Sequence, residues 1–117
     1  MDIEFLREYC LHKPGVTESF PFDAETLVMK VMGKMFALIP LEQGNQVALK
    51  CDPNRAVELR DEWEEITGAY HMSKTHWNSV VLSQRLPSKL ILELVDHSYE
   101  LVVAGLKKSE KALLAGL

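Results

Sequence analysis

The chain has 117 residues, 47% of them apolar and 26% charged, which suits one soluble globular domain spanning residues 1–117. No apolar run approaches the roughly 18 residues that cross a bilayer, and residues 1–4 lack the basic segment of a signal peptide, so we expect a cytoplasmic protein without a membrane partner. The formal net charge of −4 argues against nucleic-acid binding by the whole surface, because phosphate contacts require local lysine and arginine.

A helix is predicted at the N-terminus. Asp2 is a suitable N-cap, and apolar residues recur with helical spacing over residues 5–10. Pro14-Gly15 ends this helix, because proline disfavours helical backbone at the preceding residue and glycine permits a turn. Residues 16–26 show no clear periodicity, and we expect them to wrap an edge of the core.

Three strands are predicted next. Alternation of apolar and other residues over 27–32 and 46–51 indicates strands with one buried face, and the apolar run 35–39 indicates a central strand. Gly33-Lys34 is expected to form a two-residue hairpin turn between the first two strands. The second face carries Lys30, Gln46 and Lys50, and its simplest interpretation is a solvated sheet face.

A second helix is predicted from Asp52-Pro53, an N-cap followed by a proline in the first turn. Its buried stripe runs from Ala56 to Ile66, and we expect Trp63 within it to be largely buried. Gly68 suits a left-handed C-cap that would end the helix. The acidic residues 61–65 are interpreted as its solvated face rather than as paired catalytic carboxylates.

The stretch 69–78 concentrates hydrogen-bonding and aromatic side chains, which favours a recognition surface over a plain turn. We expect a short strand, a turn near residues 73–75, and a longer strand over 76–82. Trp77 either anchors this hairpin by packing or stacks on a base. His71 and His76 either hold the hairpin by hydrogen bonds or contact phosphate, and Lys74 at the turn is the best candidate for a phosphate contact.

The longest helix is predicted from Ser88, as its cap, to Gly105, with a continuous apolar stripe that includes a largely buried Tyr99. Residues 107–114 indicate a short terminal helix with Leu113 and Leu114 directed inward. The order of elements indicates an α+β fold, an antiparallel sheet of about five strands with helices packed on it.

No catalytic or metal-binding motif is found in the sequence. Cys10 and Cys51 are expected to be buried free thiols, and two histidines without a cysteine or carboxylate partner make a poor zinc site. The serines lack a nucleophile-elbow motif, and there is no glycine-rich phosphate loop. We therefore expect neither enzymatic activity nor a cofactor.

Three segments resemble the MmcQ/YjbR family of small bacterial proteins, and the resemblance covers essentially the whole chain. They are Tyr9-Cys10 with Lys13-Pro14-Gly15, the segment Tyr70 to Trp77, and Asp96-His97-Ser98-Tyr99. The resemblance implies a "double wing" fold, in which two β-hairpins flank a helical element, and it implies binding to double-stranded DNA. It supplies no target sequence.

Carried over to this chain, the resemblance points to His71, Lys74, His76 and Trp77 in the second hairpin, and to Ser98 and Tyr99 on the long helix. We interpret the last pair as close helix–sheet packing with a hydroxyl hydrogen bond. The first hairpin adds Lys30 and Lys34.

So few cations predict weak, largely sequence-independent DNA binding. The alternative is a protein-interaction or adaptor domain that uses the same His/Trp surface. Lysines 30, 34, 50 and 74 would be clustered on one side of the fold in the first case and scattered among carboxylates in the second.

Overall fold

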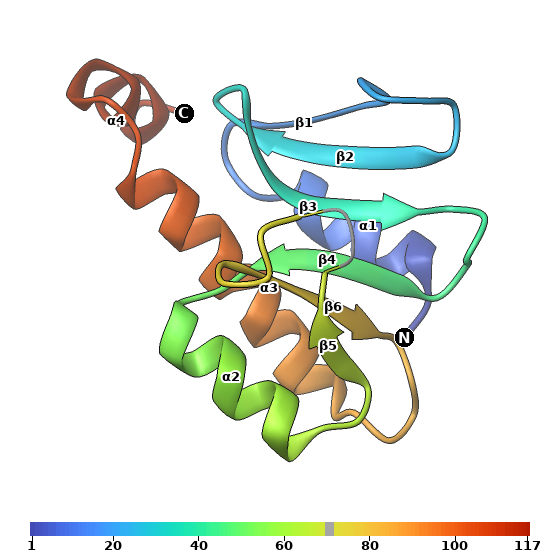
Figure 1. Ribbon diagram of the computed structural model, residues 1–117. Coiled ribbons are helices and arrows are strands. Elements are labelled where there is room, and N and C mark those ends of the chain that lie inside the picture. Colours follow the sequence, from blue (N-terminus) through green and yellow to red (C-terminus); the bar gives the residue numbers. More distant parts are fainter. Residues whose placement is uncertain (70–71) are drawn as a thin grey trace.

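The structure is a computed structural model that describes residues 1–69 and 72–117. Within these residues it forms one antiparallel sheet of six strands with four helices (Figure 1). The strands are β1 (Val16–Ser19), β2 (Thr26–Val31), β3 (Lys34–Pro40), β4 (Gln46–Lys50), β5 (Ile66–Gly68) and β6 (Trp77–Val81), in the spatial order β1-β2-β3-β4-β6-β5. The helices are α1 (Ile3–Leu11), α2 (Pro53–Glu62), α3 (Ser88–Ala104) and α4 (Lys108–Ala115). The predicted α+β class is confirmed.

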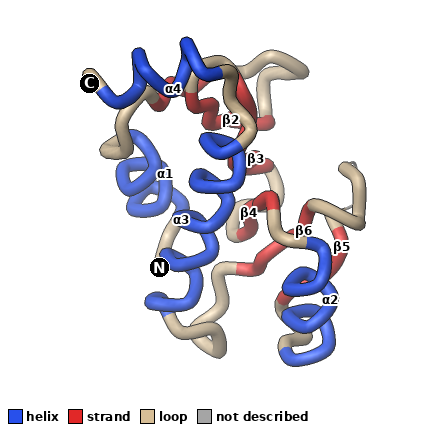
Figure 2. The backbone as a smooth tube through the Cα atoms, turned by 90° about the vertical axis from the view of Figure 1, so that its left-hand side faces the viewer, coloured by secondary structure: helices blue, strands red, loops and turns tan. Residues whose placement is uncertain are grey.

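The two faces of the sheet have different environments. Helices α1 and α3 cover one face, while α2 lies at the far edge beside β5 (Figure 2). The main core lies between this face and the helices and includes Phe36, Ile39 and Val95, none of which is exposed. The opposite face, called the open face below, carries a smaller buried cluster of Val28, Leu38, Ala69 and Trp77.

The register assigns side chains to the open face, because directly paired residues of an antiparallel sheet point the same way. Val28 pairs with Leu38 in β2 and β3, and both belong to the smaller cluster. Lys30 pairs with Met35, and Lys50 pairs with Trp77 in β6. Lys30 and Lys50 therefore share the open face, as the alternation in the sequence predicted.

The turn of the first hairpin is one residue earlier than predicted. Met32 and Gly33 are its central residues, with φ of 50° and 81°, and Lys34 already belongs to β3. Positive φ at both central positions is the requirement of a type I′ turn, whose twist matches that of the strands. Methionine rarely adopts this conformation; here its peptide N–H donates to Gly15 O at 3.2 Å and its side chain packs on the core.

The segment predicted to wrap the core edge instead contains strand β1. Its residues pair with β2 from Val16 opposite Val31 to Ser19 opposite Val28. Arg7 on α1 donates two hydrogen bonds of 2.6 Å to the Glu18 carboxylate, which ties this strand to the helix. Because β1 is an edge strand without a fully buried residue, it lacks the apolar alternation by which strands are predicted.

Helix α2 ends six residues before the predicted stop at Gly68. Trp63 has extended backbone, and Ile66 belongs to β5, where it pairs with Val80 of β6. Ile66 is buried in β5. A residue on the buried side of a longer helix would be apolar as well, so the apolar character of Ile66 could not distinguish a further helical turn from a strand. Trp63 is half-buried rather than largely buried.

The C-terminal helices lie close to the predicted ranges, but Pro87 occupies the N-cap position of α3 and Ser88 is its first helical residue, so the prediction that Ser88 caps this helix is wrong. Helix α3 buries Ile91, Leu94, Val95 and Val102 against the sheet, whereas Tyr99 is half-buried rather than largely buried. In α4, Leu114 is buried but Leu113 is 67% exposed, so the prediction that both point inward is wrong for Leu113. No helix among residues 1–69 and 72–117 is both long and apolar enough to cross a membrane.

Candidate nucleic-acid interface

Lys30 and Lys50 lie at the same end of the open face. β2 ends with Lys30-Val31. β4 runs parallel to β2, because both strands are antiparallel to β3 between them, and it ends with Lys50. Neighbouring strands are about 4.8 Å apart, which places the backbones of the two lysines roughly 10 Å apart. Both side chains are half-buried, so their stems lie along the sheet while the ammonium groups reach water.

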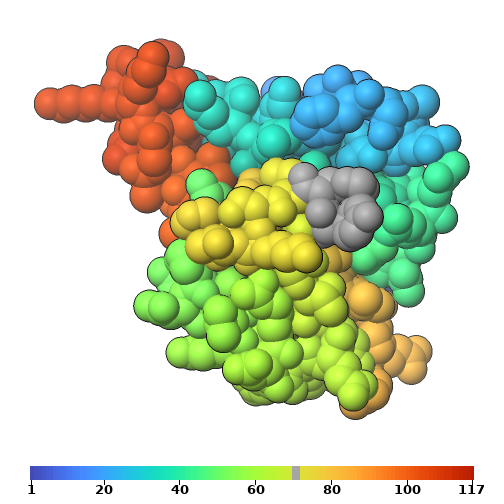
Figure 3. Space-filling view, viewed as in Figure 1, coloured from blue at the N-terminus to red at the C-terminus, as the bar shows by residue number. Residues whose placement is uncertain are grey.

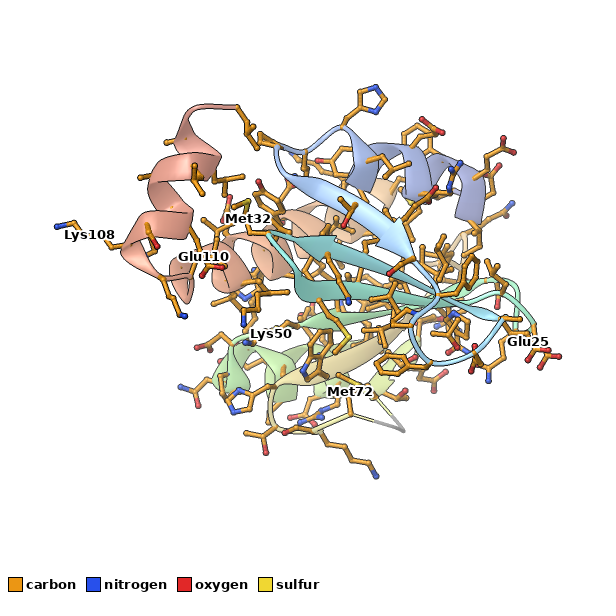
Figure 4. The ribbon with its side chains drawn as sticks, turned by 90° about the horizontal axis from the view of Figure 1, so that it is seen from above. Glu25, Met32, Lys50, Met72, Lys108 and Glu110 are labelled. Atoms are coloured by element: carbon orange, nitrogen blue, oxygen red, sulfur yellow. The ribbon has the colours of Figure 1, made fainter. Side chains whose placement is uncertain are left out.

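Other cations gather at this end of the sheet. Lys34 is exposed at the tip of the first hairpin, and the exposed Lys74 and His76 precede β6, whose first residue pairs with Lys50. We call Lys30, Lys34, Lys50, Lys74 and His76 the basic end. Figure 4 shows Met32 at the hairpin tip and Lys50 toward one end of the sheet, with Glu25 at the opposite end.

A cation missed by the sequence analysis supports this end of the sheet. Arg60, in the last turn of α2, donates from Nη1 to the Lys74 peptide oxygen at 2.8 Å. A Cβ on Gly68 would lie 3.1 Å from both Arg60 Nη1 and Lys74 Cγ. Glycine at this position therefore permits close approach of two side chains, instead of capping a helix. In the sequence Arg60 lies inside the predicted helix, next to the acidic residues 61–65, and this position gave no signal of its role.

Trp77 anchors the open face from within. Its side chain is only 8% exposed and belongs to the buried cluster with Val28 and Leu38, with Met35 packed against it. The packing interpretation is thus confirmed, and in this conformation the indole is covered rather than free to stack on a base.

The two predicted histidines differ in what the structure describes. The peptide oxygen of His76 accepts from Cys51 N at 2.7 Å, which holds the His76 backbone in place while the His76 side chain is exposed. The prediction for His71 lies outside the described residues.

Carboxylates gather at the other end of the open face. Asp23, Glu25 and Glu42 lie in the two connections that meet where β2 begins and β3 ends. A hydrogen bond with Glu42 is the main cause that raises the pKa of Glu25, and the neighbouring negative charges act in the same direction. The sheet therefore separates positive charge from negative charge along its strands.

The residues of the first and third resembling segments meet in one cluster on the helical side. Asp96 of α3 accepts from Tyr9 Oη at 2.8 Å and from Lys13 Nζ at 2.5 Å. The Lys13 ammonium also lies 5.0 Å and 5.1 Å from the ring centroids of Tyr9 and Tyr99. Tyr99 in turn donates to Pro14 O at 2.7 Å. These contacts fasten the end of α1 to α3, so we assign the cluster a structural role.

Ser98 connects the same helix to the strand that carries Lys50. Its hydroxyl donates to Phe36 O at 2.6 Å and accepts from Lys50 N at 2.9 Å. The expected helix–sheet hydrogen bond is therefore confirmed. His97 Nε2 accepts from Asp52 N at 3.2 Å, and burial is the first cause that lowers the pKa of this imidazole. Together these bonds fix the end of β4 and hence the base of the Lys50 side chain.

Cys10 and Cys51 are buried free thiols, as predicted, and burial raises the pKa of Cys10 to about 12. Among the described residues no three histidine, cysteine, aspartate or glutamate side chains are grouped so that they could hold a metal ion. The chemistry available at the basic end is that of fixed cations facing water, which suits contact with phosphate groups.

Comparison with known proteins agrees with the resemblance noted in the sequence. A family model described as YjbR matches residues 11–101. The chain is 35% identical over 118 residues to the Escherichia coli K12 protein YjbR, with both chains covered in full. It is 33% identical over 109 residues to the Escherichia coli O157:H7 protein YbdF, covering 92% of this chain and 89% of that protein.

Two crystal structures share the fold. The Deinococcus radiodurans protein DR2400 superimposes with a TM-score of 0.90 at 39% identity, covering 97% of this chain and 88% of that chain. A Pseudomonas syringae protein superimposes with a TM-score of 0.74 at 28% identity, covering 86% of this chain and 98% of that chain.

Proposed function

This chain belongs to the YjbR family, and we propose that it binds duplex DNA weakly, with little dependence on base sequence, through the basic end of its open face. The binding role needs no catalytic step and no cofactor. The observation that carries the proposal is the gathering of four lysines at one end of a sheet in a chain of net charge −4.

The ion pairs of the molecule support this proposal. Arg7, Lys13, Arg55 and Arg85 all lie within 4 Å of carboxylates on the body of the protein. In the part of the chain that the structure describes, no such partner is found for Lys30, Lys34, Lys50 or Lys74. Lysines without a carboxylate partner keep their charge available for phosphates, and they release counterions from DNA when they bind.

The number of cations limits the strength of binding. About four phosphate contacts would give a slope of roughly −3 to −4 when the logarithm of the binding constant is plotted against the logarithm of salt concentration. The dissociation constant at physiological salt should fall in the non-specific range of about 10⁻⁴ to 10⁻⁶ M. Phosphate contacts alone do not read bases, so affinity should vary little among duplex sequences.

Titration of a fluorescently labelled duplex at 50, 100 and 200 mM salt tests the proposal. The double variant Lys34→Glu/Lys74→Glu changes two exposed residues of the basic end, and it should weaken binding to unrelated duplexes by a similar factor of at least ten. The control pairs Arg85→Glu with Lys89→Glu, which makes the same change of net charge at exposed residues that follow β6, beyond the strand end opposite the one that pairs with Lys50.

Two results would contradict the proposal: no binding by the wild type at 50 mM salt, or equal loss in the double variant and its control. The protein-interaction alternative on the second hairpin would then take its place. That alternative has less support, because the Trp77 side chain that would supply its apolar contact is buried.

A further inference from the structure

A hollow of about 520 Å³ lies on the open face at the end opposite the basic end. Leu38 and Ala48 form its floor, and Phe22 and Met72 stand on its borders in two separate connections. Figure 3 looks onto this face, where the blue segment around residues 20–25 and the green segment around residues 41–46 border that end of the sheet. Its volume is in the range of pockets that hold small organic molecules.

Small side chains in the middle strands create the hollow. Ala48 of β4 pairs directly with Ser79 of β6, so two short side chains stand together where larger ones would fill the space. On one side the floor is continued by Leu38 and on the other by Ala69, both buried. The result is a shallow apolar floor in which Leu38 and Ala69 are nearly covered and the half-buried Ala48 still reaches solvent.

Fixed polar groups line the same hollow. Ser79 donates from Oγ to Gln46 Oε1 at 2.9 Å, and the Gln46 amide in turn donates to the side chain of Gln43. This chain of hydrogen bonds holds the Gln46 side chain in one orientation over the pocket. A pocket with an apolar base and a few oriented polar groups is the usual form of a small-molecule site.

The charge around the hollow is negative. Asp23 lines it, and its carboxylate accepts hydrogen bonds from Glu25 N and Thr26 N at 2.9 and 2.7 Å, which lowers its pKa and keeps it ionised. Glu25 and Glu42 lie close enough beside it that their interaction raises the pKa of Glu25. No lysine or arginine is among the described residues of the lining.

We infer that this hollow binds a small organic cation, an amine attached to an aromatic or branched apolar body. The apolar body would lie on Leu38 and Ala48 between Phe22 and Met72, and the ammonium group would lie near Asp23. A cation at this position would relieve the repulsion between the gathered carboxylates. The inference does not depend on DNA binding, because the two sites lie at opposite ends of the face.

Nuclear magnetic resonance titration with two matched probes tests the inference. Tryptamine and indole-3-propionate share the indole ring and carry opposite charges at neutral pH. Tryptamine should shift the backbone amides of Gln46, Ala48 and Ser79, and indole-3-propionate should bind at least tenfold more weakly. Ala48→Leu, which fills the hollow, should remove the tryptamine shifts, whereas Ala112→Leu on the exposed side of α4 should leave them unchanged.

A second pair of variants tests the role of charge. Asp23→Asn should weaken tryptamine binding severalfold, and Glu58→Gln on the exposed face of α2 should not. The inference is overturned if tryptamine causes no shifts in these residues, if the anionic probe binds equally well, or if Ala48→Leu leaves binding intact in a protein whose spectrum shows it to be folded. None of these outcomes bears on the duplex titration described above.

Discussion

Ser98 takes the place of a missing strand pairing. Strands β3 and β4 pair only through Ala37–Leu49 and Leu38–Ala48, and beyond that point the Ser98 hydroxyl joins Phe36 O to Lys50 N. Since Ser98 is fully buried, no water can replace its hydroxyl without rearrangement. One hydroxyl thus satisfies two backbone groups in the interior.

Ser98→Ala should therefore lower the free energy of unfolding by about 1–3 kcal/mol, because a buried peptide N–H and a carbonyl oxygen each lose their partner. Urea unfolding measures this change. Ser88→Ala is a matched control, since Ser88 is exposed at the first position of the same helix, where Pro87 occupies the N-cap position. Equal midpoints for the wild type and Ser98→Ala would show that the hydroxyl is not required there.

At the scale of elements, α3 is the helix on which the sheet depends. It packs against β2, β3 and β4, and its buried face includes Leu94 and Val102, which are 4% and 7% exposed. Helix α4 is attached much more lightly, with Leu114 as its buried residue against the core and Leu113 turned to solvent. The two helices should differ accordingly in their sensitivity to truncation.

Leu94→Ala or Val102→Ala should each cost about 1–4 kcal/mol of unfolding free energy, through lost burial and the cavity left behind. Leu113→Ala, which removes an exposed side chain, should change it by less than about 0.5 kcal/mol. Denaturant midpoints for the three variants decide the matter. A loss at Leu113 as large as that at Leu94 would mean that α4 is covered on its outer side in solution.

For the whole molecule, the Tyr9–Asp96 contact links the N-terminal helix to α3 across most of the chain. Burial is the first cause that raises the pKa of Tyr9 to about 12 from its ordinary value of 10.0, followed by the hydrogen bond to Asp96. The pKa of the neighbouring Cys10 is also raised to about 12, from 9.0, by burial. The folded protein thus holds two protons that the unfolded chain releases at lower pH.

The free energy of unfolding should consequently be highest below about pH 9 and fall progressively between pH 9 and 12, where the unfolded chain has lost these protons and the folded protein retains them. Urea unfolding at pH 8, 9, 10 and 11 measures the decline. Tyr9→Phe should make the decline shallower, because phenylalanine has no proton to release. An unchanged dependence on pH in this variant would show that Tyr9 titrates alike in the folded and unfolded states.

Much of the fold could be predicted where the pattern in the sequence has a local physical cause. Asp52-Pro53 begins α2 because the carboxylate accepts from Arg55 N and proline suits the first turn. The alternation in β2 and β4 correctly placed Lys30 and Lys50 on the face away from the main core. The boundary of α2 could not be predicted, because the strand pairing of Ile66 with Val80 joins residues that are distant in the sequence.

For the candidate site, the sequence identified the lysines but not how they are arranged. Lys34 and Lys74 could be recognised as exposed cations near turns, while their position at one end of the sheet follows from the register of strands that are not adjacent in the chain. The covering of Trp77 by Val28 and Leu38 likewise depends on strand order. So does the hollow, which exists because Ala48 happens to be paired with Ser79.

The sequence by itself determined the fold class, the long helix, the free thiols and the family, because helical periodicity, turn residues and local motifs are properties of neighbouring residues. Only the tertiary structure decided the separation of charge along the sheet. A net charge of −4 is a sum over the chain, and it says nothing about position. Pairing and register bring Lys30 beside Lys50, and they gather Asp23, Glu25 and Glu42 at the other end, since antiparallel strands carry residues of distant sequence to a common edge.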